Sequence, residues 1–196
     1  MKPFLSLGSS GLFTGVVGRA AFGALLVICT AFVPHVAVAG FTYSLKGKVT
    51  YVNDGDTIEL QVSRRERVTV RLASIDAPEI GRRNRPSQPF AQAARRALQR
   101  LVQDEVVTAE CYEEDHYARH ICDIVLPDGT TANQYLVHEG LVWANMEKGG
   151  RFMRDPALPK LEREAQEARR GLWAQSPQIQ PWVWRYQCWN QNQCNQ

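Results

Sequence analysis

Alternating apolar and polar positions predict five β-strands. The clearest case is residues 67–73, where Val68, Val70 and Leu72 lie on one face and Arg71 on the other. Four further runs have strand character: residues 43–52, 57–62, 106–111 and 120–126. We therefore expect Arg71 on the face opposite the apolar core, and the last two runs as a hairpin.

Apolar residues at helical spacing predict three helices. Ser87 follows a basic, irregular stretch at residues 82–86 and is expected to cap the first helix. The apolar stripe of this helix is Phe90, Ala94, Ala97, Leu98, Leu101 and Val102. A shorter second helix is expected over residues 132–139, ending at Gly140.

The third helix has clear start and stop signals. Asp155 is expected as its cap, Pro156 as its first residue and Gly171 just after its end. Its predicted buried stripe is Leu158, Leu161, Ala165 and Ala168. Five strands interrupted by three helices predict an α+β fold with a small closed antiparallel barrel.

Composition narrows the class of protein. The chain has 196 residues, 44% of them hydrophobic and 22% charged, with a net charge of +3. These values exclude a disordered tail, a collagen-like repeat and a protein with many membrane spans. Residues 1–39 hold two basic residues and no acidic one, so the remainder has 21 basic and 20 acidic residues. That balance does not by itself indicate nucleic-acid binding.

The amino-terminal region has the layout of a secretory signal. Lys2 and Arg19 precede an uncharged apolar run at residues 20–33, and the small residues 37–39 follow it. This pattern predicts cleavage before Gly40 and export to the periplasm or beyond. An uncleaved membrane anchor is the alternative, although the run is shorter than a membrane span of roughly 20 residues.

Four cysteines remain after the predicted cleavage, an even number that favours disulfides in an exported chain. Cys111 and Cys122 lie on the two runs of the expected hairpin, so cross-strand pairing is favoured. Cys188 and Cys194 would then close a small loop in the tail. A zinc site is the rival interpretation, but the spacing of cysteines and histidines does not match one.

Two acidic groups carry the candidate chemistry. Asp54 and Asp56 flank a glycine, which by itself is most often a tight turn. Asp76 and Glu79 follow the arginine-bearing strand, and Pro78 keeps that segment extended. Oxygen ligands from Asp56, Asp76 and a backbone carbonyl suit calcium or magnesium.

Arginines accompany these acids. Arg71 stands on the non-core face of its strand, and Arg119 begins another strand. Guanidinium groups bind phosphate oxygens in pairs, so two arginines and a cation form a sensible set for a phosphodiester transition state. Each arginine alone is more often a surface residue. Two further clusters are expected to flank the site and follow a nucleic-acid backbone: Arg64, Arg65 and Arg67, and Arg82, Arg83 and Arg85.

Residues in several motifs resemble the staphylococcal nuclease (thermonuclease) family, over roughly residues 43–174. The main motifs are residues 54–57, 71–79 and 117–119, in the family's order and approximate spacing. Similar residues follow at Asn133, Gly140-Leu141 and residues 170–173. Each motif alone is weak, whereas the ordered set is specific.

The resemblance implies a five-stranded OB-fold barrel with three helices. It also implies calcium-dependent hydrolysis of DNA and RNA with little sequence specificity, leaving 5′-hydroxyl and 3′-phosphate ends. By position, the cation would be bound by Asp56, Asp76 and the backbone carbonyl of Ala77. Asp54 would lie next to these ligands without binding the cation itself. Glu79 would activate the attacking water.

The same resemblance assigns the substrate contacts. Arg71 and Arg119 would grip the scissile phosphate, with His116 and Tyr117 as further contacts. Three departures from the family pattern bear on activity: Ala118 stands where the family has glycine, His116 where lysine is common, and residues 143–146 lack the tyrosines that pack on a bound nucleotide. Trp143 and Phe152 are candidate replacements, although each also suits the core.

The predicted organisation is a signal peptide (1–39), a nuclease domain (40–175) and a tail rich in Trp, Gln and Asn (176–196). We expect a monomer without stable membrane association after cleavage. Two rival functions remain: a catalytically weak or inactive OB-fold module that binds nucleic acid or protein, and a structural envelope protein that makes contacts through its tail. The retained acids and arginines favour catalysis over both.

Overall fold

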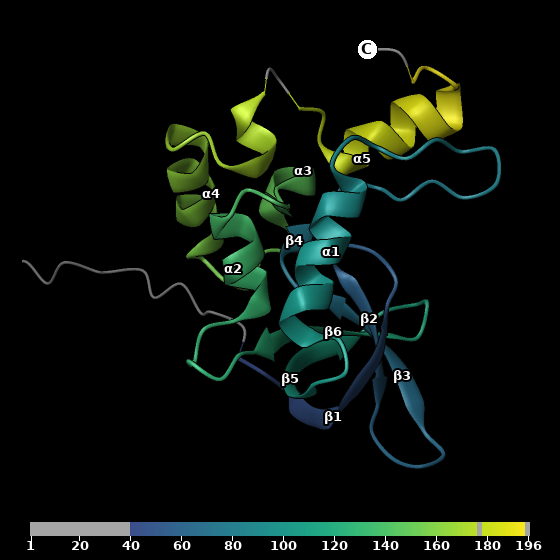
Figure 1. Cartoon of the computed structure of the whole chain (residues 1–196), viewed down its shortest axis with the longest axis vertical. Helices are drawn as coiled ribbons and strands as arrows, with labels where there is room; N and C mark the ends of the chain where they lie inside the picture. The colour runs from purple at the N-terminus through teal and green to yellow at the C-terminus, as the bar shows by residue number, and fades with distance from the viewer. Residues whose placement is uncertain (1–39, 176–177, 195–196) are drawn as a thin grey trace, which may run out of the picture. The chain divides into compact units, whose positions relative to one another are not determined.

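The computed structural model describes residues 40–175 and 178–194, so the predicted leader lies outside the described residues. Five strands close into a barrel in the order β1-β2-β3-β6-β5, as Figure 1 shows. These strands are β1 (Tyr43–Val52), β2 (Thr57–Gln61), β3 (Arg67–Leu72), β5 (Val106–Glu114) and β6 (Arg119–Val125). The closed barrel with its helices confirms the predicted OB-fold of the α+β class.

One seam of the barrel differs from the wholly antiparallel expectation. Strands β3 and β6 pair in parallel, with Thr69 opposite Arg119 and Leu72 opposite Cys122. The chain between them contains a helix and β5, which is the crossover that a parallel pair requires. Thr69 is the partner of Arg119, and Arg71 is two residues further along β3, on the same face as Thr69. Arg71 and Arg119 therefore lie on the same face of the β3–β6 pair.

The barrel interior is filled by one face of each strand. Val70 and Leu72 are buried as their alternation predicts, and Arg71 lies on the opposite face. The other fully buried strand residues include Val49, Val52, Ile58, Leu60, Ala109 and Ile124. Burial of these apolar side chains is the main force that closes the barrel.

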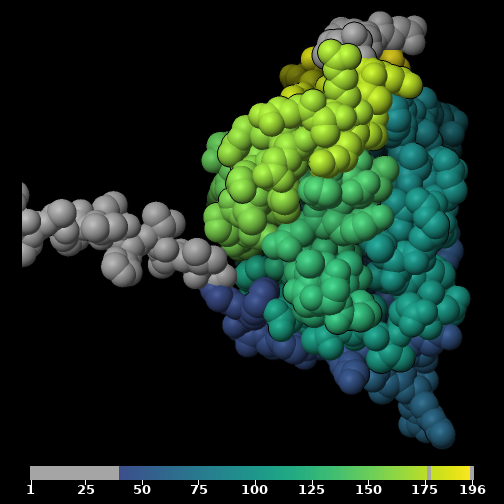
Figure 2. All heavy atoms as spheres, turned by 60° about the vertical axis from the view of Figure 1, so that its left-hand side comes forward, coloured from purple at the N-terminus to yellow at the C-terminus, as the bar shows by residue number. Residues whose placement is uncertain are grey.

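Three helices cover the barrel: α1 (Ala91–Val102), α2 (Ala132–His138) and α4 (Leu158–Glu167). Helix α1 buries the predicted residues Ala94, Ala97, Leu98 and Val102, and it packs against α2 and β1. Helices α2 and α4 pack against each other, and Figure 2 shows their green and yellow-green atoms as one continuous surface.

The predicted start of the first helix was wrong. Helix α1 begins at Ala91, after Phe90 in the left-handed region (φ 67°), and Ser87 is not its cap. The Ser87 hydroxyl instead accepts the Gly81 N–H at 2.9 Å. Pro89 disfavours the helical conformation of the preceding residue, so the helix starts only after the proline.

The third predicted helix also begins later than expected. Asp155 accepts the Ala157 N–H at 2.8 Å, forming a turn that precedes α4, whose first residue is Leu158. Leu158 and Ala165 are buried as predicted, but Ala168 is exposed because it lies beyond the last helical residue. The second helix matches its prediction, with Thr131 as its cap.

The sequence analysis did not predict several short elements. Each of them has too few residues to show a hydrophobic period. A two-stranded sheet pairs Ile75 with Ala144 and Asp76 with Trp143. The short elements are β4 (Ile75–Asp76), β7 (Trp143–Ala144), α3 (Glu147–Gly150), η1 (Gly171–Ala174), α5 (Pro181–Trp184) and η2 (Arg185–Asn190).

Both predicted disulfides are present. Cys111 and Cys122 are cross-strand partners in the β5–β6 ladder, and their bond joins these two strands of the barrel covalently. Cys188 and Cys194 close a small loop at the end of the carboxy-terminal segment. Within residues 40–175 and 178–194, none of the helices has the length and apolar character to cross a bilayer.

Two motifs of the family resemblance serve packing. Gly140 has φ 65°, and a Cβ there would lie 2.4 Å from the Arg170 carbonyl oxygen. The Leu172 N–H donates to the Gly140 carbonyl at 2.8 Å. Asn133 is fully buried and links α2 to the barrel, donating to the Ala73 carbonyl at 2.9 Å. These residues fix the helices that surround the site.

Candidate active site

The Asp54-Gly55-Asp56 turn joins β1 to β2 and is both a turn and a site element. Asp54 accepts the Asp56 N–H at 3.1 Å, and Asp56 Oδ1 accepts the Thr57 hydroxyl at 3.0 Å. A Cβ on Gly55 would lie 2.7 Å from the Cβ of Ala94 and 2.8 Å from that of Ala77. Only glycine lets the turn pack this closely.

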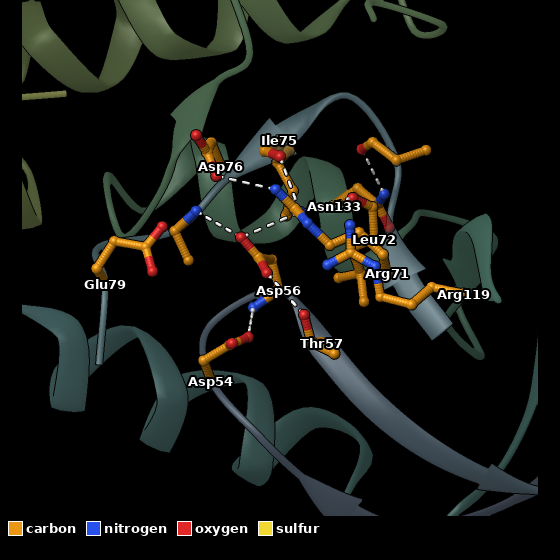
Figure 3. Close-up of polar contacts among 12 residues, drawn as sticks. Asp54, Asp56, Thr57, Arg71, Leu72, Ile75, Asp76, Glu79, Arg119 and Asn133 are labelled. Carbon is orange, nitrogen blue, oxygen red and sulfur yellow. Dashed lines mark hydrogen bonds and ion pairs between the residues drawn. The ribbon is translucent and has the colours of Figure 1, made fainter. Parts of the chain in front are cut away.

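Arg71 lies between two buried carboxylates. Its Nη1 is 3.0 Å from Asp56 Oδ2, and its Nη2 is 2.9 Å from Asp76 Oδ1. Figure 3 shows the guanidinium pointing at both acids. Nη1 also donates to the carbonyls of Leu72 (3.1 Å) and Ile75 (3.0 Å). The arginine therefore links strand β3 to the segment that returns beside it.

The returning segment presents Asp76 and Ala77. Ser74 has φ 63° and lies in the turn between β3 and β4, which ends at Asp76. Asp56 Oδ2 accepts the Ala77 N–H at 2.6 Å, so the two acidic loops are joined directly. Asp56 and Asp76 are 5% and 1% exposed. The sequence-predicted ligands are thus brought together.

Glu79 lies beside this pair, on the loop that leads to α1. Gln88, which is 4% exposed, accepts the Glu79 N–H at 3.1 Å and donates its own N–H to the Glu79 carbonyl at 2.8 Å. The Glu79 carboxylate accepts a short hydrogen bond from Arg185 of η2. Backbone contacts with Gln88 therefore hold Glu79 at the edge of the site.

Arg119 is the first residue of β6, and Asp115 holds its side chain. The Asp115 carboxylate accepts from Arg119 Nε at 2.9 Å and from Nη2 at 2.7 Å. Ala118, immediately before it, has φ 55°, in the left-handed region that favours glycine. The departure from the family's glycine at this position is therefore accommodated by a strained backbone.

His116 and Tyr117 lie on the same turn and are exposed. Their ring centroids are 3.8 Å apart, and Arg119 lies 5.3 Å from the Tyr117 ring centroid. Both rings line the same cavity as Arg71 and Arg119. Their position is consistent with the substrate contacts that the resemblance assigns.

The aromatic candidates that follow Gly140 divide between core and cavity. Trp143 is 3% exposed and packs edge-on against Trp173, with centroids 5.7 Å apart. Phe152 is 39% exposed and lines the cavity. Of the two, only Phe152 is placed to meet a ligand.

A cavity of about 640 Å³ unites the site. It is lined by both acidic loops, both arginines and the carboxy-terminal segment, through Asp54, Asp56, Arg71, Asp76, Ala77, Glu79, Arg119 and Arg185. Its size suits a nucleotide-sized ligand, since small-molecule sites are commonly 300–1,000 Å³.

Burial raises the pKa of Asp54, Asp76 and Glu79. For Asp54, burial and the nearby Asp56 charge raise the pKa to about 7. Burial also raises the pKa of Asp76 and of Glu79, against the effects of Arg71 and Arg185 on Asp76 and of Arg185 on Glu79. Crowded acids of this kind favour a bound cation, which lowers the cost of keeping them ionised.

The donor chemistry fits a hard divalent cation. Asp56 and Asp76 supply carboxylate oxygens on adjoining loops, and Ala77 adds a backbone carbonyl, all of which suit calcium. In the described ranges, no three His, Cys, Asp or Glu side chains are grouped to hold a metal by themselves. A cation here would therefore take the carbonyl and water or phosphate oxygens as its remaining ligands.

The two predicted arginine clusters have different locations. Arg82 and Arg85 line a smaller cavity of about 240 Å³ together with Glu79. Arg67 pairs with Gln61 at the far end of the β2–β3 hairpin, four residues along β3 from Arg71, and Arg64 and Arg65 lie beyond it in the turn. At about 3.4 Å per residue, that end is some 14 Å from Arg71. None of these three arginines lines the site cavity, so the prediction that this cluster flanks the site was wrong.

Three site residues were missed from the sequence: Gln88, Asp115 and Arg185. The i, i+4 spacing of Asp115 and Arg119 is a signal for their ion pair. Gln88 and Arg185 carry no local signal, because Gln88 reaches Glu79 across a loop of nine residues and Arg185 lies 106 residues away.

Comparison with known proteins agrees with this geometry. Residues 69–175 match the family described as "Staphylococcal nuclease homologue". The chain is 35% identical over 142 residues to an "Uncharacterized endonuclease" of Escherichia coli O157:H7, covering 72% of this chain and 86% of the relative. It is 34% identical over 175 residues to a "Micrococcal nuclease" of Shigella flexneri, covering 85% and 95%.

A third relative is "Protein ParB" of Escherichia coli, 34% identical over 149 residues and covering 72% of this chain and 79% of the relative. The family match spans more than half of the chain, including most of β3, both site arginines, Asp76 and Glu79. Together with the barrel and the cavity, these similarities place the chain in the family of staphylococcal nuclease homologues.

Proposed function

We propose that the protein is an exported, calcium-dependent endonuclease that hydrolyses DNA and RNA with little sequence specificity. The observation that carries the proposal is the position of the Arg71 guanidinium between two buried acids. Arg71 and Arg119 lie on the same face of the β3–β6 pair, and both line one cavity. Relatives named as endonuclease and micrococcal nuclease support a nuclease activity.

The cation site would use Asp56, Asp76 and the Ala77 carbonyl. When bound, calcium would polarise a phosphate oxygen and stabilise the negative charge on it. Asp54 accepts the Asp56 N–H and thereby fixes the turn that carries the first ligand. The Ala77 N–H does the same from the other side, because it donates to Asp56 Oδ2.

The arginines would bind the scissile phosphate. A phosphodiester gains negative charge as water attacks, and guanidinium groups aimed at the equatorial oxygens stabilise that charge. Arg71 is held by carbonyls as well as by acids, so it is fixed in place before substrate binds. Arg119 is held by Asp115 and would exchange part of that pairing for phosphate.

Glu79 would act as the general base. Its carboxylate takes a proton from water, the water oxygen bonds to phosphorus, and the bond from phosphorus to the 5′ oxygen breaks. The 5′ oxygen leaves as a hydroxyl once protonated, and the phosphate stays on the 3′ oxygen. Burial raises the pKa of Glu79, which makes it a stronger base than an exposed glutamate.

The lack of sequence specificity follows from the residue types. Arg82 and Arg85 lie beside Glu79 and would bind backbone phosphates, which carry no sequence information. His116, Tyr117 and Phe152 present rings to the cavity and would stack on bases of any identity. Such contacts serve DNA and RNA alike.

Export rests on the predicted leader and the two disulfides. Disulfides persist in oxidising compartments such as the periplasm, and both pairs are formed here. We propose a signal peptide over 1–39, a nuclease domain over 40–175 and a tail over 176–196, acting as a monomer that is not held to a membrane.

The test is to incubate the purified protein with single-stranded DNA in calcium or in chelator and to follow chain length. We expect shortening in calcium alone, with new 5′ ends that a kinase labels directly and 3′ ends that a polymerase extends only after phosphatase treatment. DNA that stays intact but is retarded in a gel would instead identify a binding module.

A further inference from the structure

The carboxy-terminal segment enters the site through one residue, Arg185, the first residue of η2. Its Nη2 lies 2.9 Å from Asp76 Oδ2, and its Nη1 lies 3.2 Å from Asp76 Oδ1. Nη1 also makes a short hydrogen bond to Glu79, and Nη2 lies 3.9 Å from Glu147. Arg185 thus contacts both a proposed ligand and the proposed base.

We propose that Arg185 is the resident counter-ion of the cation site and that docking of the carboxy-terminal segment competes with divalent-cation binding. This inference rests on the proposed function, because it takes Asp76 as a cation ligand. In the docked state Arg185 occupies the carboxylates of Asp76 and Glu79. A cation frees these carboxylates by displacing Arg185.

The carboxylate contacts put Arg185 and a cation in competition for the oxygens of Asp76. Asp76 Oδ1 accepts hydrogen bonds from both Arg71 and Arg185, and Oδ2 accepts one from Arg185. A calcium ion needs these oxygens at 2.3–2.6 Å. It would then lie within a few ångströms of a fixed guanidinium, and two cations repel strongly at that distance in a buried site.

Charge balance explains why Arg185 docks when no divalent cation is bound. Asp56, Asp76 and Glu79 line one cavity, and Arg71 pairs with the first two of them. A second guanidinium offsets the excess negative charge, and Arg185 brings it to Asp76 and Glu79. A divalent cation supplies that charge equally well and makes the second arginine unnecessary.

The rest of the segment holds Arg185 through the buried residues Pro181, Trp184 and Cys188 and through contacts with the loop before α1. Gln88 donates to the Ile179 carbonyl at 2.5 Å, and Trp189 donates to the Pro86 carbonyl at 3.1 Å. Arg85 lies 5.2 Å from the Trp189 ring centroid. Figure 1 shows this segment in yellow beside the loop before α1.

These anchors have a functional consequence. The two hydrogen bonds and the ring contact all involve the loop of residues 81–90, which follows Glu79 directly. Helix α5 and η2 are short, and the disulfide between Cys188 and Cys194 bonds the segment to itself rather than to the barrel. The segment is thus attached covalently only through the chain that leads to it, so it is free to lift off without breaking a disulfide.

The first experiment measures calcium affinity of the full chain by titration calorimetry, for the parent protein and Arg185→Gln. A segment docked nine-tenths of the time weakens the apparent affinity about tenfold, so we expect Arg185→Gln to bind calcium about tenfold more tightly or better. The matched control, Arg83→Gln, removes an equal charge from an exposed position of the neighbouring loop and should change the affinity less than twofold.

The second experiment measures amide hydrogen exchange over residues 181–190. We expect calcium to speed exchange there in the parent protein, and Arg185→Gln to exchange fast with or without calcium. Equal or weaker calcium binding by Arg185→Gln, or slower exchange of this segment in calcium, would overturn the competition while leaving the nuclease proposal standing.

Failure of the cation assignment has a different signature. Asp76→Asn in the Arg185→Gln background should abolish calcium binding, which locates the ion at the proposed site. If neither the parent nor Arg185→Gln binds calcium in the calorimeter, the cation site of the proposed function is itself refuted, and the competition with it.

Discussion

Replacing Arg71 with lysine keeps one positive charge but removes the fork that spans Asp56 and Asp76. The guanidinium bridges Asp56 Oδ2 at 3.0 Å and Asp76 Oδ1 at 2.9 Å through different nitrogens. A lysine ammonium is a single point on a flexible stem and cannot take both positions together with the two carbonyl contacts. We therefore expect Arg71→Lys to lose both rate and stability.

The magnitudes follow from the contacts. Losing one transition-state donor costs on the order of 10²–10³ in rate. The Arg71 side chain is only 15% exposed and its two partners are more deeply buried, so an unmatched acid remains in the interior. We expect the free energy of unfolding in chelator to fall by about 2–4 kcal/mol.

Arg119→Lys is the matched comparison. Arg119 pairs with Asp115 at a more open position, with 31% of the arginine side chain exposed, and the pair has i, i+4 spacing. Such a pair contributes about 1 kcal/mol or less to stability. We expect Arg119→Lys to lose rate as Arg71→Lys does, but to unfold at nearly the parent urea concentration.

The assays are initial rates of single-stranded DNA cleavage in calcium and urea unfolding followed by circular dichroism in chelator. Turnover of Arg71→Lys within a factor of three of the parent would remove Arg71 from the mechanism. Equal stabilities for the two lysine variants would refute the argument that Arg71 joins two buried acids.

Three further predictions concern stability. Ala118→Gly should raise the free energy of unfolding by about 0.5–1 kcal/mol, because the left-handed φ of 55° costs alanine more than glycine loses in chain entropy. Replacing both Cys111 and Cys122 with alanine should lower it by about 2–4 kcal/mol, measured by urea unfolding without reductant. Burial raises the pKa of Asp123 from 3.8 to about 6, so the native state binds more protons than the unfolded state between these values. The Asp123 carboxyl should therefore lower stability in chelator by about 1–2 kcal/mol as pH rises from about 5 to 8, and Asp123→Asn should remove that part of the slope.

Each of these has a clear contrary result. A destabilised Ala118→Gly protein would mean that the strain at this turn is absent. Unchanged stability after removal of the barrel disulfide would show that the strand ladder alone fixes that seam. An Asp123→Asn protein whose stability varies with pH as steeply as that of the parent would contradict the raised pKa of Asp123.

The site acids and arginines were predictable because local pattern places them. Strict alternation over β3 puts Arg71 opposite Val70 and Leu72, and the structure has it there. The aspartates around Gly55 occupy a tight turn whose geometry follows from the residues themselves. The alternation of apolar and polar residues does not predict that β3 and β6 pair in parallel. That pairing depends on how the intervening chain crosses the barrel.

Contacts between segments account for the rest of what sequence reasoning missed. Pro89 delays the start of α1, and Gln88 before it pairs with Glu79, nine residues away. Arg185 stands 109 residues from Asp76 and reaches it only because the carboxy-terminal segment folds back. The pattern of apolar and polar residues along the chain does not predict contacts between such distant residues. The helix propensity of these short elements is also too weak to predict them.

The most direct test of the account compares the parent protein with Glu79→Gln in single-stranded DNA cleavage in calcium. Glu105→Gln makes the same chemical change at an exposed position and serves as the control. We predict that Glu79→Gln loses rate by on the order of 10²–10⁴ while Glu105→Gln cleaves at the parent rate. Cleavage by Glu79→Gln at the parent rate would contradict the claim that this site hydrolyses phosphodiester bonds through Glu79.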